Sequence, residues 1–185
     1  MTHRLHFADW VAFPVPRVFA FFSNPENLPR LMPPETATKV DSFQLVVPSA
    51  LPGQDAINAH HFAGKGSIID TSFRPIRFLS WRRKWTAAIT EFEWNQYFAD
   101  MQMKGPFHHW HHRHEFIAEA RDGIEGTLVR DVIDYEVGLG PLGAVANSLF
   151  IERRMREIFA YRQKILPDLL RQSTPASGTT KADPQ

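Results

Sequence analysis

The sequence predicts one α+β domain, in which a curved antiparallel sheet of six or seven strands wraps around a long C-terminal helix. Three observations lead to this prediction. Apolar residues follow a period of two from about residue 39 to 137, they switch to helical spacing between about 141 and 170, and two short proline-led helical segments follow the first strand. Consecutive strands followed by a helix are typical of a domain whose helix lies across one face of its sheet.

The first predicted element is a strand over residues 3–12. Leu5 and Phe7 share one side of it, and Asp9 joins them if the alternation continues. Pro14 and Pro16 end the strand, because proline cannot donate a hydrogen bond to a sheet.

Two short helices are expected next, over residues 16–22 and 25–31. Pro16 and Pro25 fit the first turns of these helices, where a missing N–H group costs no hydrogen bond. Ser23 or Asn24 is the expected N-cap of the second helix.

The remaining elements follow from the change of period. Strands are predicted over residues 39–47, 60–73, 76–89, 92–103, 107–120 and 127–137. The C-terminal helix is expected from about Pro141 to Leu170, with apolar residues at helical spacing that include Ile151, Met155, Ile158, Ile165 and Leu169. We therefore expect one domain over residues 1–171 and a disordered polar tail over residues 172–185.

Composition excludes several classes of function. The 185 residues carry a formal net charge of +1, so no electrostatic surface for nucleic acid is expected. No segment approaches the length of a membrane span, and no secretory signal is apparent, so a cytoplasmic protein is the expectation. Cysteine is absent, which excludes disulfides and thiolate metal sites. The fifteen Phe and five Trp indicate a dense core or an aromatic-lined cavity.

The last hairpin has a predictable register. Asp122-Gly123 is a strong signal for a two-residue turn, which would pair Arg121 with Ile124. One face then opposes His109 with Glu136, His111 with Asp134, Arg113 with Val132, and Glu115 with Arg130. The other face opposes Trp110 with Tyr135, His112 with Ile133, His114 with Asp131, and Phe116 with Val129. A longer loop through Gly126 would shift the pairs by two residues and keep the same faces.

Five of the nine histidines lie within residues 108–114, and the alternation of the strand separates them. His109 and His111 are expected to face solvent beside acidic partners, His112 and His114 are expected to face inward, and His108 lies at the start of the strand. A metal site needs about three converging ligands. We therefore expect no metal here and no other cofactor.

The inward pair of His114 and Asp131 allows several interpretations. A carboxylate that accepts an imidazole N–H fixes the tautomer and can raise the histidine pKa. The pair could be a satisfied polar contact in the core, a ligand contact or an acid–base pair. The facing of Phe98, Asp100 and Gln102 stays open. A three-residue loop at Gly105-Pro106 would turn them inward, whereas a two-residue loop would turn Met101 and Met103 inward.

Several motifs follow one another along the chain: Phe13-Pro-Val-Pro-Arg-Val-Phe19, Phe22-Ser-Asn-Pro-Glu-Asn-Leu28, Phe98-x-Asp-x-Gln-x-x-Gly-Pro-Phe107, Trp110-x-His-x-His-x-Phe116, Gly126-Thr-Leu-x-x-Asp-x-x-x-Tyr135 and Gly140-Pro-Leu-Gly143. With these motifs the chain resembles the helix-grip superfamily of START-related, polyketide-cyclase-like and Bet v 1-like proteins, and within it the bacterial ligand-binding branch often labelled cyclase/dehydrase. The resemblance covers about residues 3–170. It implies a deep, mostly apolar cavity between sheet and C-terminal helix, and it transfers no set of catalytic residues.

The leading hypothesis is a non-catalytic protein that binds a hydrophobic or amphipathic small molecule, such as a lipid, quinone or polyketide-like compound. The expected ligand-binding residues are Trp85, Trp110, His112, His114, Phe116, Asp131 and Tyr135. The alternative is an enzyme of cyclase or dehydratase type, with His114 as general base, Asp131 as its orienting group and Tyr135 as a proton donor. A protein-interaction module that uses the outward His/acid face is a third hypothesis. The identity of the ligand and the oligomeric state stay open.

Overall fold

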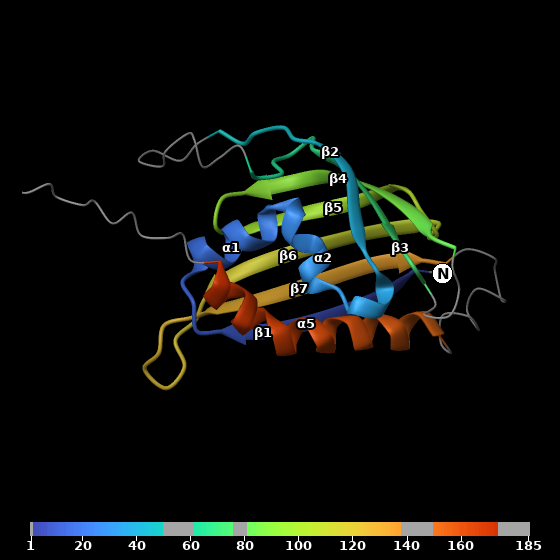
Figure 1. Ribbon diagram of the computed structural model, residues 1–185. Helices are drawn as coiled ribbons and strands as arrows, with labels where there is room; N and C mark the ends of the chain where they lie inside the picture. The colour runs from blue at the N-terminus through green and yellow to red at the C-terminus, as the bar shows by residue number, and fades with distance from the viewer. Residues whose placement is uncertain (1, 50–60, 76–80, 138–149, 174–185) are drawn as a thin grey trace, which may run out of the picture.

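Seven antiparallel strands form one curved sheet in the computed structural model, which describes residues 2–49, 61–75, 81–137 and 150–173 (Figure 1). The strands lie in the order β1-β7-β6-β5-β4-β3-β2, so the first strand pairs with the last. Their bounds are β1 His3–Val11, β2 Lys39–Gln44, β3 Ile68–Phe73, β4 Arg83–Glu93, β5 Tyr97–Lys104, β6 His109–Ala118 and β7 Thr127–Glu136. The predicted fold class is confirmed.

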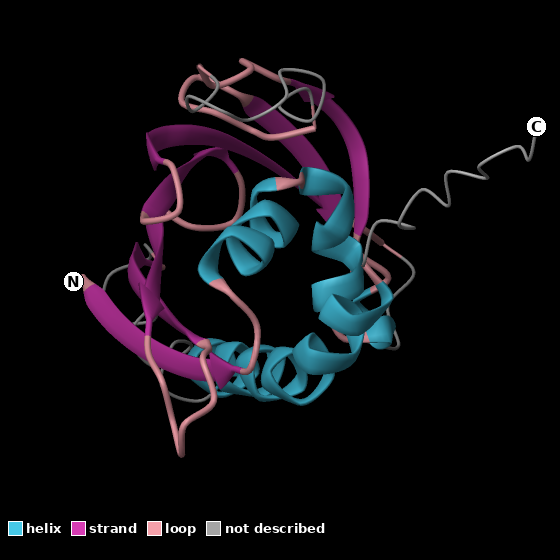
Figure 2. Ribbon diagram, turned by 90° about the vertical axis from the view of Figure 1, so that its left-hand side faces the viewer, coloured by secondary structure: helices cyan, strands magenta, loops and turns pink. Residues whose placement is uncertain are grey.

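The helices lie on the concave side of this sheet (Figure 2). Their bounds are α1 Val15–Ser23, the short 3₁₀ turns η1 Pro25–Asn27 and η2 Pro34–Thr36, α2 Leu28–Leu31 and α5 Glu152–Gln172. Asn24 caps η1, because its Oδ1 accepts a hydrogen bond from the Glu26 N–H at 3.0 Å. Helix α5 packs against β1, α1 and α2, and no helix among the described residues is long and apolar enough to cross a membrane. The expected helix start near Pro141 and most of the expected tail lie outside the described residues.

Several expected strand boundaries are wrong. The strand predicted over residues 39–47 ends at Gln44, and the strand predicted from residue 76 begins at Arg83, while residues 76–80 lie outside the described residues. The predicted break between Ile89 and Phe92 does not occur, because β4 continues to Glu93 and its residues keep pairing with β5 across a bulge. The turn comes later, where Asn95 adopts a left-handed backbone conformation with φ 59°. The strand predicted over residues 60–73 begins only at Ile68, after a turn in which Gly66 has φ 94°.

The predicted register of the β6–β7 hairpin is confirmed at every pair. His114 lies opposite Asp131, Trp110 opposite Tyr135, and Arg121 opposite Ile124. Asp122 and Gly123 have φ values of 50° and 75°, as a type I′ turn requires. The longer loop through Gly126 is therefore not used.

The interior is divided into two apolar halves, and the division recurs on β1, β6, β7 and α5. The packed half contains Val11 of β1, Phe116 of β6, Val129 of β7 and Leu166 and Leu170 of α5, together with Val18 and Phe19 of α1, Leu31 of α2, and Phe98. The open half contains Leu5 and Phe7 of β1, Trp110 of β6, Ile133 and Tyr135 of β7, and Met155 and Phe159 of α5, together with Phe107. Trp85 joins the open half, with its ring 5.0 Å from that of Trp110.

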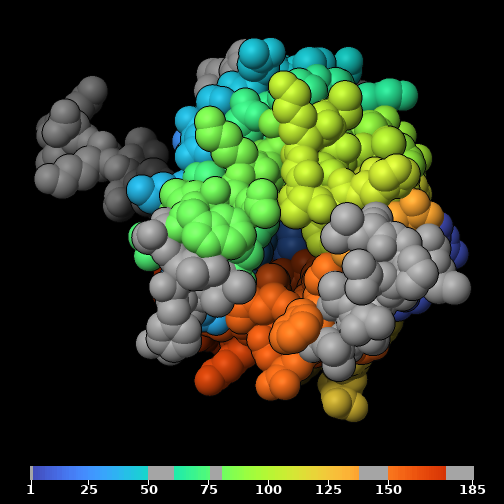
Figure 3. All heavy atoms as spheres, turned by 90° about the vertical axis from the view of Figure 1, so that its right-hand side faces the viewer, coloured from blue at the N-terminus to red at the C-terminus, as the bar shows by residue number. Residues whose placement is uncertain are grey.

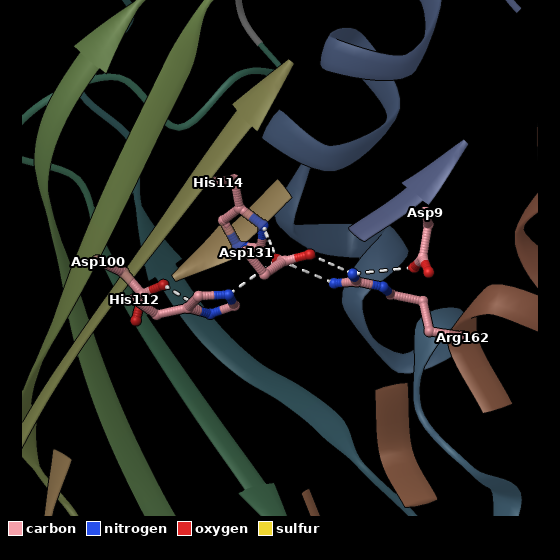
Figure 4. Close-up of polar contacts among 6 residues, drawn as sticks. All are labelled: Asp9, Asp100, His112, His114, Asp131 and Arg162. Carbon is pink, nitrogen blue, oxygen red and sulfur yellow. Dashed lines mark hydrogen bonds and ion pairs between the residues drawn. The ribbon is translucent and has the colours of Figure 1, made fainter. Parts of the chain in front are cut away.

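Charged and polar residues lie between the two halves on the same elements. We call this set the polar layer; it consists of Asp9, Asp100, His112, His114, Asp131 and Arg162 (Figure 4). The sheet and α5 thus carry apolar, then polar, then apolar side chains along their shared interior. A buried polar layer of this kind must satisfy its own charges.

Candidate functional site

Asp131 is the centre of the polar layer. Its side chain has no solvent exposure, and both of its oxygens accept hydrogen bonds from the Arg162 guanidinium of α5, with Nη1 3.1 Å from Oδ1. Arg162 Nη2 also donates to Asp9 Oδ2 at 3.2 Å. Arg162 therefore fastens α5 to both β7 and β1 through charge-assisted bonds.

Two imidazoles meet the same carboxylate from the neighbouring strand. His112 Nε2 lies 2.9 Å from Asp131 Oδ1, and His114 Nδ1 lies 2.7 Å from it, although the second contact lacks the alignment of a hydrogen bond. An ionised carboxylate can only accept hydrogen bonds, so His112 Nε2 carries the proton in this contact. Asp131 thereby sets the tautomer of His112 and leaves Nδ1 as its acceptor or ligand atom.

The electrostatics keep Asp131 ionised and His112 neutral. Burial alone would raise the pKa of Asp131, but the Arg162 guanidinium and the two imidazoles outweigh it and hold that pKa well below its usual range. Burial lowers the pKa of His112, and the neighbouring His114 lowers it further against the opposing effect of Asp131. The layer therefore presents a neutral imidazole near neutral pH.

Asp100 on β5 completes this side of the layer. Its Oδ2 lies 3.7 Å from His112 Nδ1, and burial raises its pKa despite the nearby His112. The Trp110 indole N–H favours the ionised form of Asp100, yet it has no aligned acceptor among the described residues. Burial likewise raises the pKa of Asp9, although the nearby Arg162 guanidinium partly lowers it.

Local sequence explains most of this arrangement. His112 and His114 are two residues apart on one strand, so they share a face, and the tight hairpin places Asp131 opposite His114. Asp100 lies opposite His112, and Phe98 lies opposite His114. The sequence left two orientations of β5 possible. In the structure Phe98 and Asp100 face inward.

Arg162 was missed by the sequence reasoning, although a signal for it exists. It lies seven residues after Met155 and four before Leu166, on the buried stripe of α5 where an apolar residue is expected. A charged residue on such a stripe requires a buried partner of opposite charge, and Asp9 and Asp131 are the inward acidic residues that supply it.

Of the expected ligand-binding residues, His112, His114 and Asp131 belong to the polar layer, and the others divide between the two halves. Trp85, Trp110 and Tyr135 lie in the open half, whereas Phe116 is buried in the packed half against Phe19 and Phe98. Tyr135 has no exposed surface, and its ring contacts Phe107 and Trp110.

The outward residues of β6 and β7 form ion pairs on the convex face. His111 Nε2 lies 3.5 Å from Glu91, and His108 Nδ1 lies 3.2 Å from Glu136. Asp134 lies opposite His111 as expected, but its carboxylate accepts hydrogen bonds from Arg4. The cross-strand acids lie as predicted, but Arg4 of β1 and Glu91 of β4 supply the closer ion-pair partners.

Solvent reaches the polar layer from the open half. The side chains of Asp100 and His112 are 17% and 12% exposed, while Asp131 behind them is fully buried. Figure 3 shows this end of the molecule hollowed between the first turns of α5 and the β4 and β5 segments.

This arrangement offers three kinds of chemistry. Asp100 and His112 can hydrogen-bond a polar group, and the neutral imidazole can accept a proton. Ligand atoms of Asp100, His112 and His114 also lie within 4.8 Å of one another, close enough to suggest a shared cation.

Solved structures with the same fold include proteins of different activities. A START superfamily protein from Mycobacterium smegmatis is 14% identical, covers 93% of this chain and 99% of its own, and superposes with a TM-score of 0.60. The Zhui aromatase/cyclase from a Streptomyces species is 11% identical, with coverage of 96% and 99% and a TM-score of 0.63. Norcoclaurine synthase from Thalictrum flavum, solved with dopamine and hydroxybenzaldehyde, is 14% identical, with coverage of 95% and 90% and a TM-score of 0.57. At these identities the likeness shows the fold alone.

Sequence comparison gives the family directly. Among curated proteins, none matches this chain. The family model described as polyketide cyclase/dehydrase and lipid transport matches residues 11–159, a range that includes β2 to β7 and the first turns of α5 but not Asp9 of β1 or Arg162. The chain belongs to the polyketide cyclase/dehydrase and lipid transport family, and its fold is the helix-grip fold.

Proposed function

We propose that this protein binds an amphipathic small molecule in its open half. The apolar part of the ligand packs against Trp85, Phe107 and Trp110, and its polar group meets Asp100 and His112. Family membership supports a hydrophobic ligand or cyclase-type chemistry without specifying the substrate.

One observation carries this proposal. Trp85, Phe107 and Trp110 form a cluster with ring centroids 5.0 to 5.7 Å apart, yet each keeps partial exposure although it lies on the concave side of the sheet. Asp100 and His112 are partly exposed beside them. Aromatic walls with a few polar groups at one end are typical of small-molecule sites.

Asp131 has a different role in this proposal from the one expected. It is fully buried and already accepts bonds from Arg162 and His112, so no ligand reaches it. We assign it the positioning of the two imidazoles. The polar contact with the ligand then falls to Asp100 and His112.

The binding test uses the fluorescent amphiphile anilinonaphthalene sulfonate with the whole chain. Trp110→Ala removes one wall of the proposed site and should weaken probe binding at least tenfold. Trp10→Ala is the matched control, because Trp10 lies on β1 away from this cluster and bonds to the Glu119 carbonyl at 2.9 Å. If Trp110→Ala and Trp10→Ala bind the probe with equal affinity, the proposed site is refuted.

A second candidate function is acid–base catalysis on the bound ligand, which the neutral His112 held by Asp131 favours. Native mass spectrometry of undenatured protein should first detect a copurifying compound. If the protein is a dehydratase, that compound should lose one water on incubation with the parent chain, and it should persist with His112→Gln. Persistence in both would leave binding as the function.

A further inference from the structure

We propose that Asp100, His112 and His114 form a site for one first-row divalent transition metal, with Zn²⁺ as the fitting ion. This proposal does not rest on the binding of an apolar ligand. It reverses the expectation from sequence, where the alternation of β6 separated the histidines and the facing of Asp100 was open.

Three side chains each bring one potential ligand atom close to the other two. Asp100 lies directly opposite His112 on the adjacent strand, and the ring centroids of His112 and His114 are 4.0 Å apart. All three donor atoms lie within 4.8 Å of one another, and His112 Nδ1 is 3.7 Å from Asp100 Oδ2. Ligands bound about 2.0–2.2 Å from tetrahedral zinc lie about 3.3–3.6 Å apart, so small side-chain rotations suffice.

Asp131 prepares the imidazoles for this role. It contacts His112 through Nε2 and His114 through Nδ1, which leaves His112 Nδ1, 3.7 Å from Asp100 Oδ2, and His114 Nε2 as the ring nitrogens that can bind a metal. Metal-bound histidines almost always direct their second ring nitrogen to such a carboxylate, which fixes the ring and raises its basicity. In Figure 4 the three ligands gather on the side of Asp131 that faces away from Arg162.

Charge also favours a cation at this point. Arg162 is shared by Asp131 and Asp9, whereas Asp100 has no Arg or Lys partner among the described residues. Two imidazoles and one carboxylate are donors that suit zinc and related ions. Three protein ligands leave a fourth position, and the exposed sides of Asp100 and His112 place it toward the open half.

Isothermal titration calorimetry of the chelator-treated full chain with Zn²⁺ tests this site. We expect one ion per chain and at least tenfold weaker binding in His112→Gln and in Asp100→Asn. Co²⁺ in place of Zn²⁺ should give visible absorption of a four-coordinate site, which the same variants lose. Asp100→Asn changes a partly exposed group, so it reports even if His112→Gln folds poorly.

His111→Gln is the matched control. It removes an imidazole from the same strand, one residue away, but from the convex face where His111 pairs with Glu91. Unchanged Zn²⁺ affinity in His111→Gln supports the inner site. Equal loss in His111→Gln and His112→Gln, or unchanged affinity in Asp100→Asn and His112→Gln, would overturn the proposal and point to adventitious binding by surface histidines.

Discussion

The packed half and the open half share the same strands and the same helix, and both contain fully buried residues, but α1 and α2 contribute side chains only to the packed half. In the packed half, Phe19, Val129 and Leu166 have no exposed surface. In the open half, Trp110 and Phe159 remain partly exposed. The difference comes from α1 and α2, whose side chains Val18, Phe19 and Leu31 fill the packed half, whereas no short helix among the described residues fills the other.

The packed half and the open half therefore have different roles, the first in stability and the second in binding. Complete burial of apolar side chains in the packed half supplies folding free energy, and partly exposed rings in the open half keep surface for a ligand. The polar layer lies at the boundary, where Arg162 must neutralise buried acids on one side while His112 meets solvent on the other. The following predictions test whether the three regions have these separate roles.

The largest effect is expected from Arg162→Met. The substitution leaves Asp131 and Asp9 buried without their cation, and breaking a buried ion pair in this way costs about 3–5 kcal/mol of unfolding free energy. Urea denaturation measures the loss. Arg156→Met is the control, since among the described residues Arg156 pairs with Glu152 alone, on the exposed face of α5, and its loss should change stability by less than about 1 kcal/mol. Similar losses in both variants would contradict the role of Arg162.

Leu166→Ala and Phe159→Ala compare the two halves on one helix. Leu166 is fully buried, and its truncation should cost about 2–5 kcal/mol. Phe159 stacks on Phe7 with centroids 3.9 Å apart but is partly exposed, so its truncation should cost only about 1–2 kcal/mol. The same denaturation experiment measures both. A larger loss for Phe159→Ala would mean that the open half is as tightly packed as the other.

In metal-free protein, acidification should lower the free energy of unfolding, because the folded state holds His112 neutral. Its folded pKa is lowered, so between about pH 6.5 and the folded pKa the unfolded chain binds a proton that the folded chain does not. Its contribution to stability is therefore lost as pH falls below about 6.5. Asp100 has the opposite effect on the free energy of unfolding at lower pH. Its pKa is raised, so the folded chain binds a proton there before the unfolded chain does.

Unfolding free energies of the parent chain and of His112→Asn, measured from pH 7.5 to 5, isolate this contribution. The parent should lose more stability than the variant over this range. Parallel pH profiles would show that His112 is not held neutral by its surroundings.

The smallest effect is expected on the convex face. Glu91→Gln breaks the pairs of Glu91 with Arg113 and His111, all of which are partly exposed. Partly exposed pairs contribute about 0–1 kcal/mol, and salt screens them. Thermal unfolding at low and high salt should therefore show a small difference that disappears at high salt, and a loss comparable to Arg162→Met would contradict the distinction between the two faces.

Sequence reasoning succeeded where local chemistry decides structure. Asp122-Gly123 has the backbone conformation of its turn type, and this turn fixed the register that places His114 opposite Asp131 and Trp110 opposite Tyr135. Period two along β6 separated His111 from His112. The fold class followed because consecutive alternating strands and a terminal amphipathic helix admit few ways to bury their apolar faces.

Tertiary structure alone decided how the polar layer is joined. The tilt of α5 brings Arg162 to Asp131 and Asp9, which are 31 and 153 residues away along the chain. The loop between β5 and β6 determined that Asp100 faces His112, an outcome that two loop lengths left open. The sequence by itself determined which side chains share a face, because that depends on alternation within each strand. Which charged groups meet across the interior depended on how sheet and helix pack, and a one-dimensional pattern does not contain that geometry.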